Sequence, residues 1–214
     1  MNVFVVGANG RIGKLLVDLL RESSEHTVKA MVRLEEQAEV FRSLEVDVSV
    51  ACLENSVEDI AQAARGSDAI VFTAGSGAQT GYDKTLLIDL DGAVKTIEAA
   101  EMVGIKRFIM VSAIQAHRRE HWNENMQPYY VAKYYADKIL EQSELTYTII
   151  RPGGLRNEPG TGKITASEDI RSGSIPREDV AKTILQSLTE ENTYYRSFDL
   201  VGGKVLIKEA LKLI

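Results

Sequence analysis

Short apolar runs rich in β-branched residues alternate with amphipathic stretches along most of this 214-residue sequence. The run Val3–Val6 precedes a glycine-rich turn, and the following stretch Arg11–Glu22 repeats isoleucine and leucine at helical spacing. Strand–helix units of this length form a parallel sheet with helices on both faces, because crossovers between parallel strands are right-handed. The sequence therefore predicts an α/β fold of the doubly wound Rossmann type, three-layered and with a mostly parallel sheet.

The same patterns predict the remaining elements. Strands are expected at Thr27–Val32, Val46–Cys52, Asp68–Thr73, Arg107–Ser112, Thr146–Arg151 and Ser197–Val201. Helices are expected at Glu35–Leu44, from the N-cap Ser56 to Ala64, at Tyr82–Val103, at Pro128–Gln142, after Pro176 and at Lys208–Leu213. A loop is expected at Pro152–Gly162. Strict alternation of apolar residues in Val46–Cys52 places that strand at or near a sheet edge.

The composition is that of one globular domain over residues 1–214, with a small substrate-side region at its C-terminal end. Hydrophobic residues make up 44% of the chain and charged residues 26%, enough to fill one sizeable core. The net charge of -6 argues against nucleic acid as a partner, because that partner requires clustered cations. Short apolar runs, no visible export signal and a lone Cys52 predict a cytoplasmic protein without membrane contact. The three histidines show no metal-ligand spacing.

The turn after the first strand reads GANGRIG, with three evenly spaced glycines. The first glycine permits a tight turn, the second lets the backbone approach a pyrophosphate, and the third lets the helix pack closely on the strand. The start of the following helix presents free N–H groups and partial positive charge to phosphates. A P-loop is excluded by the glycine spacing and because Leu15 follows Lys14. A dinucleotide is the predicted ligand of Gly7, Asn9, Gly10, Arg11, Ile12 and Gly13.

The tip of the second strand distinguishes NAD from NADP. An acidic residue there bonds the ribose hydroxyl of NAD, whereas Arg binds the 2′-phosphate of NADP. The residue is Arg33, whose guanidinium can pair bidentately with phosphate, and Arg11 in the glycine turn can assist. Glu35 and Glu36 weaken the positive field, so a merely solvated Arg33 stays open as an alternative. We expect NADP as the cofactor, with NAD also possible.

Several segments resemble the short-chain dehydrogenase/reductase superfamily, in particular its compact atypical branch of NAD(P)-binding reductase-like and NmrA-like proteins. The resemblance covers nearly the whole chain, and its segments come in the family's order at the expected strand ends. The matching segments are the glycine turn Gly7–Gly13, Ala74-Gly75, Ser112, Tyr129-Tyr130-Val131-Ala132-Lys133 and Arg151-Pro152-Gly153-Gly154-Leu155.

The resemblance implies three catalytic residues. Tyr129 is the acid/base, Lys133 also holds the nicotinamide ribose, and Ser112 orients the substrate oxygen. Tyr129 and Lys133 are four residues apart and project from one face of a helix. A nearby ammonium stabilises phenolate, so we expect a lowered pKa for Tyr129. The alternative is an ordinary tyrosine of an amphipathic helix beside a solvated lysine, since three more tyrosines share this helix.

The resemblance also implies the rest of the cofactor site. Backbone contacts to the ribose are implied for Ala74, Gly75 and Ser76, a loop on the nicotinamide side for Pro152, Gly153 and Gly154, and the adenine wall for Cys52 and Leu53. Many relatives carry Asp where this chain has Cys52, which puts a side-chain contact to adenine in doubt.

These residues predict an NADP(H)-dependent oxidoreductase that reduces a small carbonyl, quinone or flavin-like acceptor by hydride transfer. The loop from His117 to Trp122 either lines the substrate mouth or is solvated. The short chain after Pro152 disfavours a large substrate lobe. Two alternatives stay open: a non-catalytic NADP-binding sensor resembling NmrA-like regulators, and an epimerase-like enzyme. A small-molecule substrate and a monomer or homodimer are expected.

Overall fold

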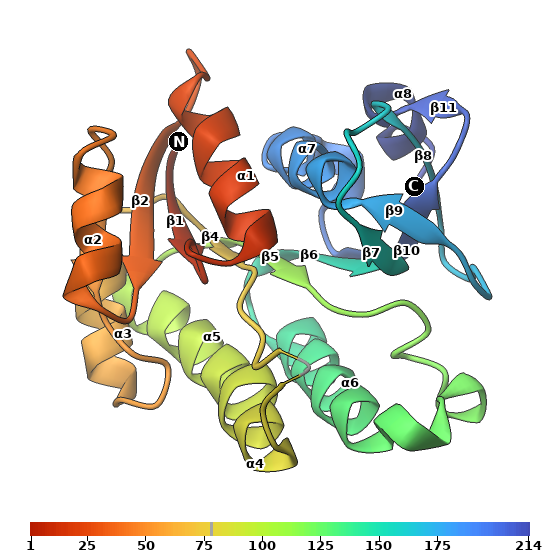
Figure 1. Ribbon diagram of the computed structural model, residues 1–214, viewed down its shortest axis with the longest axis horizontal. Helices are drawn as coiled ribbons and strands as arrows, with labels where there is room; N and C mark the ends of the chain where they lie inside the picture. Colours follow the sequence, from red (N-terminus) through yellow and green to blue (C-terminus); the bar gives the residue numbers. More distant parts are fainter. Residues whose placement is uncertain (78) are drawn as a thin grey trace.

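A nine-stranded, mostly parallel sheet runs through the computed structural model, which describes residues 1–77 and 79–214 (Figure 1). The seven strands β10, β6, β5, β4, β1, β2 and β3 are parallel to one another, whereas β8 pairs antiparallel with both β10 and β11. Because β1 lies inside, with β2 on one side and β4 on the other, the predicted doubly wound fold is confirmed. The order is β11 (Val205–Leu206), β8 (Lys163–Ser167), β10 (Arg196–Gly202), β6 (Thr146–Pro152), β5 (Arg107–Val111), β4 (Ala69–Phe72), β1 (Asn2–Val6), β2 (Thr27–Val32) and β3 (Asp47–Val50).

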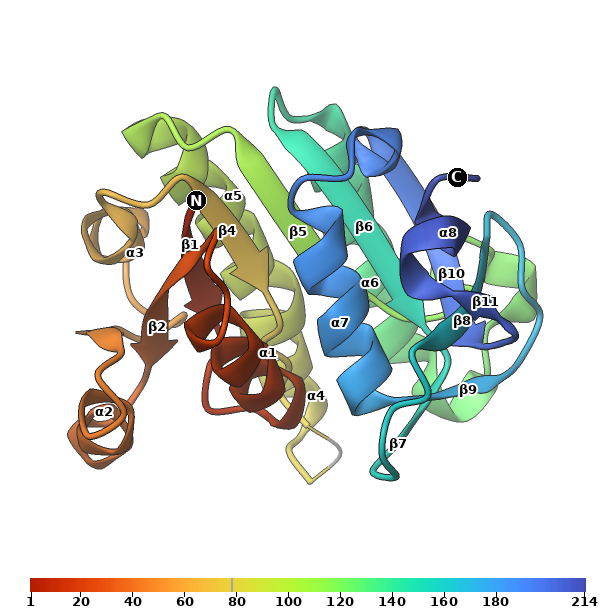
Figure 2. The same cartoon turned by 90° about the horizontal axis from the view of Figure 1, so that it is seen from above.

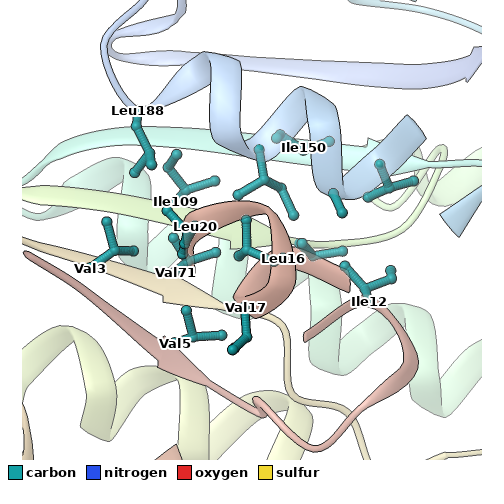
Figure 3. Packing of buried hydrophobic residues seen from close by; sticks show 14 of the residues in the cluster. Val3, Val5, Ile12, Leu16, Val17, Leu20, Val71, Ile109, Ile150 and Leu188 are labelled. Carbon is teal, nitrogen blue, oxygen red and sulfur yellow. The ribbon is translucent and has the colours of Figure 1, made fainter. Parts of the chain in front are cut away.

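Helices cover both faces of this sheet. Strand residues alternate between the two layers: Val3 and Val5 share one buried cluster with Leu16, shown in Figure 3, whereas Phe4 and Val6 belong to the other. Burial on both faces explains why the central strands are continuous apolar runs. The first layer holds α1 (Arg11–Arg21), α2 (Glu35–Arg42), α7 (Arg177–Ser187) and α8 (Ile207–Leu211), and the second holds α3 (Val57–Ala64), α5 (Gly92–Val103) and α6 (Gln127–Gln142).

The first half of the chain folds close to its predicted pattern. The third strand ends at Val50 rather than at Cys52, and it is the edge strand that its alternation predicted. Ser56 is the N-cap of α3, because its Oγ accepts a hydrogen bond from the Asp59 N–H at 3.2 Å.

The predicted helix Tyr82–Val103 is wrong in one respect, because it is not α-helical throughout. A short α4 (Tyr82–Lys84) leads into a π-helix, η1 (Thr85–Asp91), and α5 begins only at Gly92. Gly104 ends α5 in the left-handed conformation, at φ 78°, as expected of a C-terminal glycine. A π-helix has more residues per turn than an α-helix, and such segments are frequent at functional sites.

The C-terminal part departs further from prediction. The predicted loop Pro152–Gly162 contains β7 (Gly154–Arg156), which pairs in parallel with β9 (Ser174–Pro176) in a separate two-stranded sheet. Strands β8 and β11 were not predicted either. Strands β7 and β11 are short and exposed throughout, so they carry no apolar period. Strand β8 does alternate, with Ile164 and Ala166 between polar residues, although this pattern was not recognised in the sequence.

One sheet joins the chain from β1 to β11, and the protein is a single α/β domain. Within the described ranges, no helix combines the length and the apolar character needed to cross a membrane. In the same ranges, no group of three His, Cys, Asp or Glu side chains is arranged to hold a metal ion.

Candidate functional site

The glycine turn is packed so closely that two of its positions admit no side chain. Gly7 has φ 82°, and a Cβ there would stand 2.7 Å from the backbone nitrogen of Ala74. A Cβ at Gly13 would stand 2.3 Å from the carbonyl oxygen of Gly7. That carbonyl also accepts the Gly10 N–H at 2.9 Å. The turn is therefore locked between β1, α1 and the segment that follows β4.

The start of α1 is left open. Its N-cap is Gly10, which provides no side-chain cap, and its first turn contains no acidic residue. Gly10 and Arg11 are exposed and Asn9 is half-buried, whereas Ile12 points into the core. A helix start with uncapped N–H groups and an exposed glycine N-cap suits an anionic group.

The segment after β4 lies beside the turn. The Thr73 hydroxyl donates to the carbonyl oxygen of Val6 at 2.9 Å, which ties the ends of β4 and β1 together. Ala74 contacts Gly7, Gly75 is exposed, and the Ser76 N–H donates to Asp89 Oδ2 at 3.0 Å. The predicted ribose segment Ala74–Ser76 therefore adjoins the glycine turn.

Asp89 is a site residue that the sequence did not single out. It lies in the π-helix and is 1% exposed, and its Oδ1 is 3.4 Å from the Lys133 Nζ. Its other oxygen accepts the Ser76 N–H. One carboxylate thus links the ribose segment to the predicted catalytic helix. The sequence does show a single acidic residue among the apolar residues of segment 85–90. The direction in which this side chain points, however, depends on the π-helical register.

Tyr129 and Lys133 come together on α6 as predicted. The Lys133 Nζ lies 5.8 Å from the centroid of the Tyr129 ring and donates to the carbonyl oxygen of Val111 at 3.2 Å. Lys133 is 3% exposed, so it is not the solvated lysine of the alternative interpretation. Burial alone would lower the pKa of Lys133, but Tyr129 and Asp89 outweigh it and the pKa lies above its ordinary value.

The expected direction of the Tyr129 pKa is wrong. Burial raises the pKa of Tyr129 above its ordinary value, and Lys133 offsets that effect only in part while Asp89 adds to it. The phenol is therefore protonated at neutral pH. Such a group is suited to donating a proton rather than to removing one.

Ser112, at the end of β5, provides a free hydroxyl. It is 4% exposed, and its Oγ has no hydrogen-bond partner within the described residues. Nearby, Arg151 Nε donates to Asp137 Oδ2 at 2.8 Å. Burial and the positive charge of Arg151 both lower the pKa of His117. The Ser112 hydroxyl also lies close enough to Asp137 to oppose the burial that raises the pKa of that carboxyl, so a ligand oxygen would compete with Asp137 for this hydroxyl.

The predicted loop between Ser112 and α6 is partly packed. Trp122 stacks on Tyr130 with ring centroids 5.9 Å apart, and its Nε1 donates to the carbonyl oxygen of Ala116 at 3.0 Å. Arg119 lies over the Tyr134 ring at 4.5 Å. The aromatic part of this loop therefore adjoins the first turns of the helix that carries Tyr129.

The other predicted residues occupy varied environments. Arg33 is exposed at the end of β2, and its guanidinium forms no ion pair in the part of the chain that the structure describes. Cys52 is half-buried, while Leu53 is buried against α5, 3.1 Å from the place of a Cβ on Gly92.

The nicotinamide-side loop is held by close backbone packing. Pro152 is buried at the end of β6, and the Gly153 N–H donates to the carbonyl oxygen of Leu200 at 2.9 Å. A Cβ at Gly153 would stand 2.5 Å from the Gly173 oxygen, which also accepts the Gly154 N–H. Packing against the Gly173 segment is thus a structural reason for glycine at position 153.

The family model for NAD(P)H-binding proteins matches residues 7–191. The chain belongs to this NAD(P)H-binding family. The uncharacterized sugar epimerase YhfK of Bacillus subtilis is 62% identical over 212 residues, with 99% of each chain covered. A putative NAD-dependent epimerase/dehydratase from Bacillus halodurans has a similar structure, with a TM-score of 0.94, 44% identity and 100% of both chains covered. The oxidoreductase ylbE from Lactococcus lactis aligns at a TM-score of 0.90 with 33% identity, covering 100% of this chain and 96% of its own.

The residues of this NAD(P)H-binding chain fit a nicotinamide dinucleotide. Gly7 and Gly13 keep side chains out of the turn, and α1 begins without a capping side chain or an acidic residue. The buried Lys133 lies within α6, and the buried Ser112 hydroxyl lies at the end of β5. The donor set is thus suited to phosphates at one end and to a reacting oxygen at the other.

Proposed function

We propose that the protein is an NADPH-dependent oxidoreductase that reduces a small carbonyl, quinone or flavin-like acceptor in the cytoplasm, as a monomer or homodimer. The observation that carries this proposal is the buried pair of Lys133 and Asp89 beside the half-buried Tyr129, with the Ser112 hydroxyl at the end of β5. A non-catalytic sensor has no need of a buried ammonium held beside a protonated phenol.

The chain's own residues perform distinct tasks in this proposal. Reduced nicotinamide, when bound, supplies a hydride to the acceptor carbon. The Ser112 hydroxyl orients the acceptor oxygen, and Tyr129 donates its phenolic proton to that oxygen, so a carbonyl becomes an alcohol. Lys133 holds the ribose and stabilises the phenolate left on Tyr129. Asp89 keeps Lys133 charged and fixes it relative to Ser76.

The preference for NADPH rests on Arg33. Its exposed guanidinium stands at the end of β2 without an ion-pair partner in the described residues, and it pairs well with a 2′-phosphate. We expect Arg33→Glu to weaken NADPH binding by roughly 100-fold, as loss of a charged hydrogen bond and gain of repulsion imply. NADH binding should change little. Equal NADPH affinity in the variant and the wild type would overturn the assignment.

The proposed reaction is tested by following NADPH consumption with a panel of quinones, flavins and aldehydes. We expect turnover with at least one acceptor, and Tyr129→Phe should reduce it by roughly 10²–10⁴-fold while NADPH still binds. The matched control is Tyr135→Phe, an exposed tyrosine of the same helix. Tight NADPH binding without turnover of any acceptor would favour the sensor instead.

A sugar epimerase is the second candidate, because the similar proteins from Bacillus subtilis and Bacillus halodurans carry epimerase names. An epimerase returns the hydride to its own substrate, so it consumes no NADPH. Interconversion of two sugar isomers without net change in NADPH absorbance would favour this candidate. The short C-terminal region, made of small strands, α7 and α8, favours a small acceptor over a nucleotide sugar.

A further inference from the structure

A cleft of about 460 Å³ lies between the start of α1 and the start of α7, next to the glycine turn. The two helices lie side by side on one face of the sheet, with β7 close to the start of α7 (Figure 2). The lining of the cleft combines four cationic side chains with two carboxylates. The charged lining residues are Arg11, Lys14, Arg156, Arg177, Glu158 and Glu178.

The cations of this cleft are only partly neutralised. In the described ranges, Arg11, Lys14 and Arg177 have no carboxylate within ion-pair distance, and Arg156 lies 3.8 Å from Glu158. The Glu178 carboxylate is engaged elsewhere, by Lys182 at 2.6 Å and by the Gly160 N–H at 2.7 Å. In a chain of net charge -6, this cleft thus gathers four cations of which only Arg156 lies within ion-pair distance of a carboxylate.

The arginines are held toward the cleft by the fold. Arg156 ends β7 and is paired in register with Pro176 of β9, so Arg177 follows directly beside it. Asn157 Oδ1 accepts a hydrogen bond from Arg177 Nη1 at 2.7 Å and so orients that guanidinium. Arg11 and Arg177 both line the cleft, and burial together with the charge of Arg11 lowers the pKa of Arg177.

We infer that this cleft binds a phosphate group, with Arg156 and Arg177 facing Arg11 across it. Guanidinium forks match phosphate oxygens bidentately, and converging like charges are relieved by a multivalent anion. The phosphate belongs either to the dinucleotide or to a separate phosphorylated ligand. The first source rests on the proposed function, because Arg11 directly follows the N-cap glycine of the dinucleotide turn.

The test is calorimetric titration of inorganic pyrophosphate into the wild type, Arg156→Gln and Arg177→Gln. Each variant should bind pyrophosphate roughly tenfold or more weakly, as the loss of a charge-assisted hydrogen bond implies. Arg196→Gln is the matched control, since it removes an exposed positive charge from β10 and should leave the affinity unchanged. Equal affinity in all four proteins, or no binding to the wild type, would overturn the inference.

Titrations with NADPH and NADH distinguish the two sources. If the dinucleotide supplies the phosphate, Arg177→Gln weakens both coenzymes by the same factor, and NADPH displaces pyrophosphate. If a separate ligand supplies it, both coenzyme affinities stay unchanged and pyrophosphate binds to the NADPH-saturated protein. Arginine-dependent pyrophosphate binding in a protein that turns over no acceptor would refute the proposed oxidoreductase alone.

Discussion

The two ends of the site are built in different ways. At the dinucleotide end, backbone packing decides the geometry: Gly7 and Gly13 leave no room for side chains between β1, α1 and the segment after β4. At the substrate end, side chains decide it, through Asp89, Lys133 and the hydrogen bonds of the loop after β5. The first end is therefore readable from sequence as a glycine spacing, whereas the second requires three-dimensional knowledge of which side chains meet.

The largest expected effect tests the backbone end. Gly13→Ala places a Cβ 2.3 Å from the Gly7 oxygen, and overpacking of this kind costs up to about 3 kcal/mol. We expect a lowered Tm together with roughly 100-fold weaker NADPH binding, because α1 must move away from the turn.

Gly10→Ala is the informative partner of this variant. Its Cβ would lie 3.0 Å from the same oxygen, so the fold should lose much less stability. NADPH binding should still weaken, because the exposed Gly10 lets a pyrophosphate approach. Thermal unfolding and calorimetry separate the two effects. Equal stability losses in the two variants would contradict the packing account.

The second prediction concerns the loop at the substrate end. Gln115 is 3% exposed, and its Nε2 donates to Asp169 at 2.8 Å and to Asp199 at 2.9 Å. Gln115→Ala removes this donor from the exposed Asp169 and from the buried Asp199, which keeps the backbone N–H groups of residues 115 and 170. The loss costs about 1 kcal/mol in the free energy of unfolding. NADPH affinity should not change, because the glycine turn is independent of this loop.

The control for Gln115→Ala is Gln142→Ala, at the exposed end of α6, with an expected change within about 0.5 kcal/mol. Denaturant unfolding gives both values. A Gln115→Ala protein that keeps wild-type stability, or loses NADPH affinity in proportion to its stability, would break the comparison between the two ends.

The smallest effect on turnover near neutral pH is expected for Asp89→Asn, which keeps the side-chain shape and removes its charge. Its effect on stability is larger, because the buried Lys133 ammonium loses its carboxylate partner. Asp89 helps to raise the pKa of Tyr129, so the variant should have a lower phenol pKa. Reduction requires the protonated phenol and is lost as pH rises through that pKa. The alkaline limb of kcat should therefore move to lower pH, with little change near neutral pH. If the alkaline limb of the kcat profile were the same in Asp89→Asn and the wild type, Asp89 would have a structural role only.

The sequence was sufficient for features that depend on local pattern. The glycine spacing, the pairing of Tyr129 with Lys133 across one helical turn, and the edge position of β3 all follow from residues close in sequence. The role of Asp89 could not be predicted in this way, because the π-helix Thr85–Asp91 changes which residues of this segment face α6. Strand β7 could not be predicted either, because a short strand that is exposed throughout shows no alternation of apolar and polar residues.

The sign of the Tyr129 pKa shift was also beyond the sequence. The ammonium of Lys133 does lower that pKa, as its spacing predicted, but burial raises it by more. Burial depends on how α6 packs against its neighbours, so a spacing of four residues does not reveal it. Of the two directions open to an acid/base residue, the raised pKa of Tyr129 favours donating a proton.

The central claim is that an open glycine turn and the uncapped start of α1 hold a nicotinamide dinucleotide. Calorimetric titration of the wild-type protein with NADPH and NADH tests it most directly. We predict saturable binding with one site per chain, and tighter binding of NADPH than of NADH. Absence of heat with both coenzymes, confirmed by unchanged Tm in their presence, would contradict the claim.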